Sequence, residues 1–71
     1  MTERTQDVTI NGQPRTVPDP TTVAGLLEQL GVETTHVAVE QNRKLVSKKD
    51  YASSPVCAGD ELEIVTFVGG G

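Results

Sequence analysis

The residues best suited to chemistry in this sequence are three consecutive glycines, Gly69, Gly70 and Gly71, with which the sequence ends. Because glycine has no Cβ, such a segment fits a channel too narrow for any side chain, and three extended residues reach about 10 Å. The α-carboxylate of Gly71 would be unhindered, and an enzyme closing around it could convert it with ATP to a reactive anhydride. The alternative is a tail without function, either a frayed end or a cloning remnant.

The segment before the glycines is the most strand-like part of the sequence, and its side chains alternate between two faces. One face would carry Leu62, Ile64, Thr66 and Val68, and the other Glu61, Glu63, Val65 and Phe67. If Leu62 and Ile64 face the core, the outer face turns from acidic to apolar just before the glycines. We therefore predict Val65, Phe67 and Val68 as residues that dock a partner. The alternative is a twist or bulge that places Phe67 under a loop.

The hairpin expected at the start of the chain depends on its turn residues. Alternating residues over 7–10 and 13–17 flank Asn11-Gly12, which predicts a type I′ turn with positive φ at both positions. Pro14 cannot donate to an inner ladder, so the second strand is expected at a sheet edge. Residues 1–6 have no apolar periodicity and are expected to fray.

A helix is predicted from Val23 to Leu30, with an N-cap at Thr21-Thr22 and Gly31 as a left-handed C-cap. Its apolar residues recur at i, i+3, i+4 and i+7, which gives one stripe that must pack on a sheet. Further strands are expected over 36–41, 44–47 and 62–68, with a turn or single helical turn over 48–54. The order predicts an α+β fold in which a mixed sheet of four or five strands covers one helix. The single domain would span 1–68, and 69–71 would be a flexible tail.

Other candidate residues give weaker signals. Four of the six basic residues are Arg43, Lys44, Lys48 and Lys49, and acids gather at Asp60, Glu61 and Glu63. A solvated turn explains the basic set, with electrostatic steering of a partner as the alternative. Cys57 is expected to be a small buried hydrophobe rather than a reactive thiol, and His36 a surface residue at a strand end. Because phosphate-loop, nucleophile-elbow and metal motifs are absent, no catalytic or metal-binding residue is predicted.

Composition narrows the classes of function. Aromatic residues make up 3% of the 71 and the formal net charge is −4, which argues against a nucleic-acid partner. No apolar run approaches the roughly 20 residues that span a bilayer, and the polar N-terminus is no secretory signal. We expect a cytoplasmic, monomeric binding module that holds no cofactor, since a catalytic cavity is hard to form from so few residues.

Four segments are informative through their order and spacing: Thr22-Val23-Ala24-Gly25-Leu26-Leu27, Val37-Ala38-Val39-Glu40-Gln41-Asn42, Gly59-Asp60-Glu61-Leu62-Glu63-Ile64-Val65 and Phe67-Val68-Gly69-Gly70-Gly71. Together they resemble the ThiS family, sulfur-carrier proteins of thiamine biosynthesis with a ubiquitin-like β-grasp fold. The resemblance covers the chain from Asp7 onward, and Arg43-Lys44 stands where an Asn-Gly-like turn is commoner.

The resemblance implies a mechanism in which this chain is a carrier and not an enzyme. An E1-like, ThiF-like adenylyltransferase would adenylate the Gly71 carboxylate with MgATP. Sulfur from a persulfide donor would then displace AMP and leave a thiocarboxylate, which would pass its sulfur to a ThiG-like thiazole synthase. In β-grasp proteins the last strand is central, flanked by the first and third, so the tail would leave from the most rigid part of the sheet.

Three alternatives stay open at this point. The small subunit of molybdopterin synthase is also a β-grasp carrier that ends in Gly-Gly. A ubiquitin-like modifier would instead be joined to lysines through Gly71. A plain interaction domain would have an idle tail.

Overall fold

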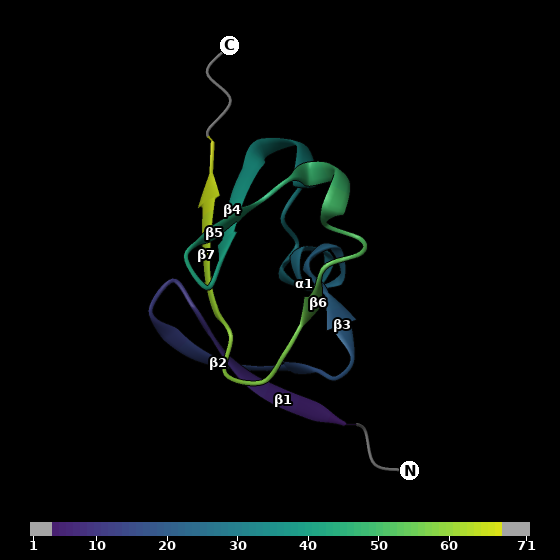
Figure 1. Ribbon diagram of the computed structural model, residues 1–71, viewed down its shortest axis with the longest axis vertical. Coiled ribbons are helices and arrows are strands. Elements are labelled where there is room, and N and C mark those ends of the chain that lie inside the picture. Colours follow the sequence, from purple (N-terminus) through teal and green to yellow (C-terminus); the bar gives the residue numbers. More distant parts are fainter. Residues whose placement is uncertain (1–3, 68–71) are drawn as a thin grey trace.

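The computed structural model describes residues 4–67, and within them a sheet and one main helix form two layers (Figure 1). Two short 3-10 helices, η1 and η2, lie in the connections. In chain order the elements are β1 (Thr5–Ile10), β2 (Gln13–Pro18), β3 (Thr21–Thr22), α1 (Val23–Leu30), η1 (Thr34–His36), β4 (Val37–Gln41), β5 (Lys44–Val46), η2 (Lys48–Asp50), β6 (Pro55–Val56) and β7 (Glu61–Thr66).

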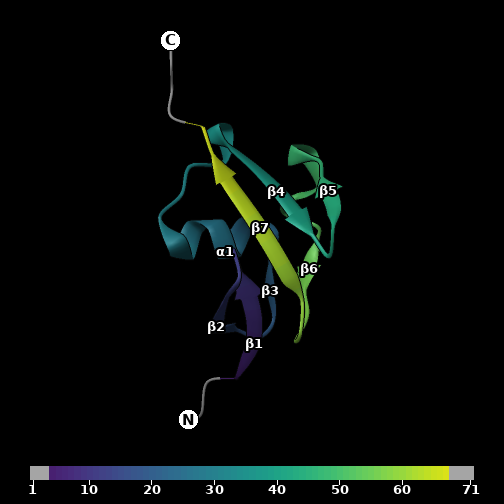
Figure 2. The same ribbon diagram turned by 90° about the vertical axis from the view of Figure 1, so that its left-hand side faces the viewer.

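The main sheet has five strands in the order β2-β1-β7-β4-β5, so the last strand in the sequence is the central one. It pairs with β1 in parallel and with β4 antiparallel. Strands β3 and β6 form a separate two-stranded pair. In Figure 2, β7 crosses the front of the molecule and α1 lies behind it, so the helix covers one face of the sheet. The mixed sheet, the central last strand and the edge position of β2 are all confirmed.

Local signals set the turns and helix ends as expected. Asn11 and Gly12 have φ of 51° and 80°, and this tight turn joins β1 to β2. The Thr22 hydroxyl caps α1 by accepting from the Gly25 N–H at 3.1 Å. Gly31 ends the helix with φ of 74° and donates its N–H to the Glu28 carbonyl at 3.0 Å. The predicted helix bounds are therefore confirmed.

The core lies between α1 and the inner face of the sheet. Val23, Leu26 and Leu27 of the helix are fully buried, and Leu62 of β7 is 1% exposed beneath them. Burying each of these side chains stabilises the fold by roughly 1.5–3 kcal/mol relative to exposure. The other core residues are Val8, Ile10, Val17, Val37, Val39, Tyr51, Val56 and Ile64.

One expectation about the N-terminus is wrong where the structure describes it. Strand β1 begins at Thr5, and Gln6 is buried rather than frayed. The Gln6 side-chain amide donates to the carbonyls of Pro18 (3.1 Å) and Val56 (3.0 Å), and so links the first hairpin to β6. A buried amide with both donors satisfied is tolerated in a core.

Among residues 4–67, no helix is long and apolar enough to cross a membrane.

Candidate functional site

The predicted docking residues that the structure describes lie on the open face of β7. Val65 and Phe67 are 53% and 54% exposed, whereas Leu62 and Ile64 on the other face are buried. The register of β7 with β4 is continuous from Leu62 to Thr66 and Phe67 is exposed, so no bulge turns Phe67 under a loop. In Figure 2 this face is toward the viewer and α1 is on the far side. The prediction that both side chains are exposed is confirmed.

A third large apolar side chain extends this face, and the sequence analysis missed it. Leu45 of β5 is 72% exposed, and its register partner Glu40 also pairs with Glu63 of β7. Ala38, the register partner of Val65, lies two residues before Glu40 on β4 and therefore on the same face, nearer the end of β7. We call Leu45, Val65 and Phe67 the apolar face. The signal in the sequence is strand alternation over Lys44–Val46, which places Leu45 on the face opposite to that of the half-buried Val46.

The acidic part of the same sheet face lies toward the start of β7. Glu40 and Glu63 are directly opposed across β4 and β7, and like charges so placed repel. Together with Glu61 and Arg43 they line an open hollow of about 260 Å³. The arginine offsets part of the negative charge. A partner that covers the whole face therefore meets apolar side chains near the end of β7 and carboxylates near its start.

Polar side chains hold the start of β7 in place. The Asp60 carboxylate accepts hydrogen bonds from the Cys57 N–H (2.8 Å), Gln41 Nε2 (2.8 Å) and Asn42 Nδ2 (3.0 Å). Partial burial by itself would raise the pKa of this carboxyl group, but the three donors outweigh it and the pKa lies below its usual value of 3.8. The Asn42 Oδ1 also accepts from the Glu61 N–H at 2.9 Å.

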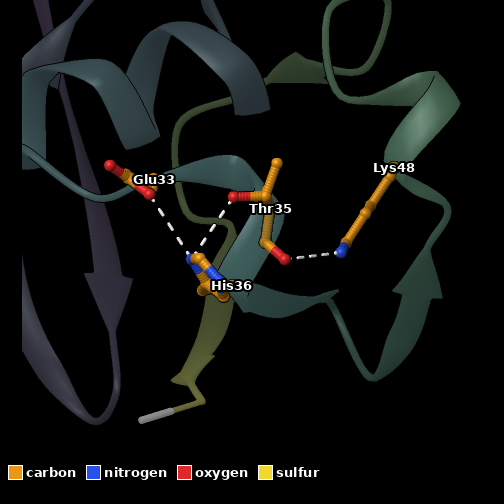
Figure 3. A network of polar contacts seen from close by, with 4 residues as sticks. All are labelled: Glu33, Thr35, His36 and Lys48. Atoms are coloured by element: carbon orange, nitrogen blue, oxygen red, sulfur yellow. Dashed lines mark hydrogen bonds and ion pairs between the residues drawn. The ribbon is translucent and has the colours of Figure 1, made fainter. Parts of the chain in front are cut away.

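The end of β7 rests against the segment before β4. The Phe67 N–H donates to the His36 carbonyl at 2.7 Å. Figure 3 shows the polar contacts of this segment: His36 Nδ1 lies 3.4 Å from Glu33 and 3.3 Å from the Thr35 hydroxyl, and Lys48 Nζ donates to the Thr35 carbonyl at 3.0 Å. These contacts hold the backbone at His36, whose carbonyl accepts the hydrogen bond from Phe67.

The basic residues do not form one set in space. Arg43 and Lys44 lie at the turn after β4, beside the start of β7, because β4 and β7 are antiparallel. Lys48 follows β5 and lies beside η1, near the end of β7. All three are exposed, as a solvated turn requires, and steering of a partner stays a prediction.

The prediction for Cys57 is wrong, whereas the prediction for His36 is confirmed. Cys57 is exposed, because its neighbour Val56 fills the core position and Cys57 opens the turn that ends at Asp60. His36 is exposed in η1, directly before β4. Within residues 4–67 there is no group of three or more His, Cys, Asp or Glu side chains that could hold a metal ion.

The remaining site residues lie outside the described residues. They are the predicted docking residue Val68, the threading residues Gly69 and Gly70, and the modified residue Gly71. The structure therefore presents the strand that leads to them and the surface beside it, and their roles stay predictions.

The fold places the chain in a known class. A crystal structure of the thiamine biosynthesis protein ThiS from Geobacter metallireducens superposes with a TM-score of 0.80 at 33% identity, and the match covers 93% of this chain and 100% of that one. The domain is therefore a ubiquitin-like β-grasp domain, as predicted. The family model described as "ThiS family" matches residues 8–71. The chain belongs to the ThiS family of small sulfur-carrier proteins of thiamine biosynthesis, which act as carriers rather than as catalysts.

The curated relatives that match the chain include a sulfur carrier and thiazole synthases. The sulfur carrier protein ThiS of Bacillus subtilis is 40% identical over 53 residues, which cover 75% of this chain and 80% of that protein. A thiazole synthase from Paramagnetospirillum magneticum is 50% identical over 62 residues, which cover 87% of this chain. The chain spans only 19% of the length of that thiazole synthase, and likewise 19% of one from Magnetococcus marinus.

Proposed function

We propose that the chain carries sulfur for thiazole formation as a thiocarboxylate on Gly71. In this cycle an E1-like adenylyltransferase uses MgATP to convert the Gly71 carboxylate to an acyl adenylate and releases pyrophosphate. The outer sulfur of a persulfide donor then displaces AMP to give an acyl disulfide, and a second thiol reduces its S–S bond, which releases the donor as a disulfide and leaves the thiocarboxylate. The thiocarboxylate passes its sulfur to a ThiG-like thiazole synthase. The carrier itself binds no cofactor, and the need for ATP favours a cytoplasmic location.

The observation that carries this proposal is the family membership over residues 8–71, because the matched span includes the three glycines. The central position of β7 supports it, since this strand is paired on both sides and leads directly to the glycines. A carrier needs such a support, because an acyl-bound sulfur reacts efficiently only where its position is fixed.

The thiazole synthase relatives support the choice of acceptor. Each contains a stretch similar to this chain within a protein about five times as long, as the 19% coverage implies. Two proteins that act on one another gain effective concentration when they are joined in one chain. We therefore favour a thiazole synthase over the large subunit of molybdopterin synthase as the partner.

The apolar face supports the docking part of the proposal. Val65 and Phe67 are exposed and lie within seven residues of Gly71 in the sequence, so a partner that covers them is also close to the glycines. Aromatic side chains are enriched at interfaces, and Val65 adds apolar area near Phe67. We propose that Val65, Phe67 and Val68 contact the adenylyltransferase, with Gly69 and Gly70 threaded toward its active site.

Intact-mass spectrometry tests the cycle. The protein from its native cell should end at Gly71 and gain about 16 Da when one oxygen becomes sulfur, and this gain should vanish in cells without the adenylyltransferase. Removing Gly70 and Gly71 should abolish the gain and leave folding unchanged. A tail that never gains sulfur, conjugates of high molecular weight, or stable association with a pterin-binding subunit and not with a thiazole synthase would each contradict the proposal.

A further inference from the structure

Asn11 holds the central strand with its side chain as well as with its backbone. Its Nδ2 donates to the Ile64 carbonyl at 3.1 Å, and its Oδ1 accepts from the Ile64 N–H at 2.7 Å. Its own N–H donates to the Leu62 carbonyl at 2.8 Å. The side-chain amide thus presents to β7 the same donor and acceptor that one further residue of β1 would present. The opposite orientation of the amide would place donor against donor, so the pairing also fixes the rotamer.

This amide is needed because β1 stops too early. The parallel pairing of β1 with β7 covers only Thr9 with Glu61 and Ile10 with Leu62, after which the chain turns away. Strand β7 continues to Thr66 with β4 alone on its other side. Within residues 4–67, the two bonds from the Asn11 side chain are the last hydrogen bonds that β7 receives on its β1 side.

We propose that Asn11 is a positioning residue for the reaction at Gly71, a role that rests on the proposed function. With the amide in place, β7 is held on both sides as far as Ile64, and its direction toward the glycines is fixed. Without it, residues 64–67 would be held on one side only, by β4 and the His36 carbonyl, and would sample a wider range of directions. An adenylating enzyme that grips the body of the carrier would then receive the carboxylate in the reactive position less often.

The second hairpin offers a matched control. Asn42 has φ of 54°, close to the 51° of Asn11, and it also bonds β7 with backbone and side chain. Its bonds to β7 are to Glu61, at the start of the strand: the Asn42 N–H donates to the Glu61 carbonyl at 2.7 Å and its Oδ1 accepts from the Glu61 N–H at 2.9 Å. Its Nδ2 donates to the Asp60 carboxylate at 3.0 Å. Asn11→Gly and Asn42→Gly each keep a residue that tolerates positive φ and remove only the amide.

Amide hydrogen exchange on the full chain and steady-state adenylation by the adenylyltransferase form the test. For Asn11→Gly, we expect exchange at Ile64, Val65 and Phe67 to rise about tenfold, the effect of losing a net hydrogen bond or two. We expect kcat for adenylation to fall several-fold with KM little changed. For Asn42→Gly, exchange should rise at Glu61 and adenylation should stay within twofold.

The outcomes separate positioning from stability and from the proposed function. A uniform rise of exchange across the sheet in Asn11→Gly, or equal adenylation losses in both variants, overturns the positioning role. If the unaltered chain is not adenylated, the proposed function fails, and the exchange pattern still decides whether Asn11 holds residues 64–67. Should Asn11→Gly not fold, Asn11→Asp replaces it with Asn42→Gly still as the control, because aspartate keeps the acceptor for the Ile64 N–H and removes the donor to the Ile64 carbonyl.

Discussion

The exposed position of Phe67 leads to a quantitative prediction for Phe67→Ala. An aromatic side chain contributes roughly 200 Å² of surface, so a side chain that is 54% exposed offers about 100 Å² for burial by a partner. At about 25 cal/mol per Å² this is about 2.5 kcal/mol, or about a sixtyfold loss of affinity as an upper value. The loss in folding stability should stay below about 2 kcal/mol, whereas a buried phenylalanine costs about 3–5 kcal/mol.

The assay measures both quantities on the same variants: urea unfolding for stability, and titration with the adenylyltransferase for affinity. Leu26→Ala, at a fully buried helix position, should cost about 2–5 kcal/mol of stability. Leu45→Ala removes an exposed side chain farther along the apolar face and should weaken binding less than Phe67→Ala. A stability loss above about 3 kcal/mol for Phe67→Ala, with affinity within twofold, would refute the docking role and make Phe67 a core residue.

Three further predictions concern the body of the carrier. Asp60→Asn should lower the free energy of unfolding by about 1–3 kcal/mol at pH 7. Because the pKa of Asp60 is lower in the folded than in the unfolded chain, the carboxylate stabilises the fold above about pH 4. Urea unfolding should therefore show the difference in stability between the variant and the unaltered chain shrinking at lower pH, with Asp50→Asn as the control. Gly25→Ala should give no gain from helix propensity, because the new Cβ would lie 2.7 Å from the Thr21 hydroxyl, and the expected gain of about 1 kcal/mol should appear only in a Thr21→Ala background. Gly31→Ala should cost about 1–2 kcal/mol in thermal or urea unfolding through its φ of 74° alone, since nothing lies within 4 Å of the added methyl group.

Features that depend on neighbouring residues could be predicted from the sequence. The Asn11-Gly12 turn, the bounds of α1 and the Gly31 cap follow from local backbone preferences, and all three are confirmed. The exposure of Val65 and Phe67 followed from strand alternation once Leu62 was assigned to the core. The chemistry of the tail rested on the glycines and on the resemblance to a family rather than on any spacing of catalytic residues.

Features that depend on distant contacts could not be predicted. Gln6 is buried because its amide meets the carbonyl of Val56, 50 positions away, and composition alone indicates an exposed glutamine. The side-chain bonds of Asn11 to Ile64 span 53 positions, so the sequence shows the turn but not the second role of its first residue. Cys57 looked like a core residue by type, but its place in the turn before Asp60 directs it outward.

The central position of β7 also determines how the domain responds to mechanical force. A partner that draws the chain outward beyond Phe67 pulls β7 along its own axis, between β1 and β4. Ladder hydrogen bonds run across the strands, so such a pull shears many of them at once instead of opening them one after another. The domain is therefore expected to stay folded when a partner binds its body and pulls on the end of β7.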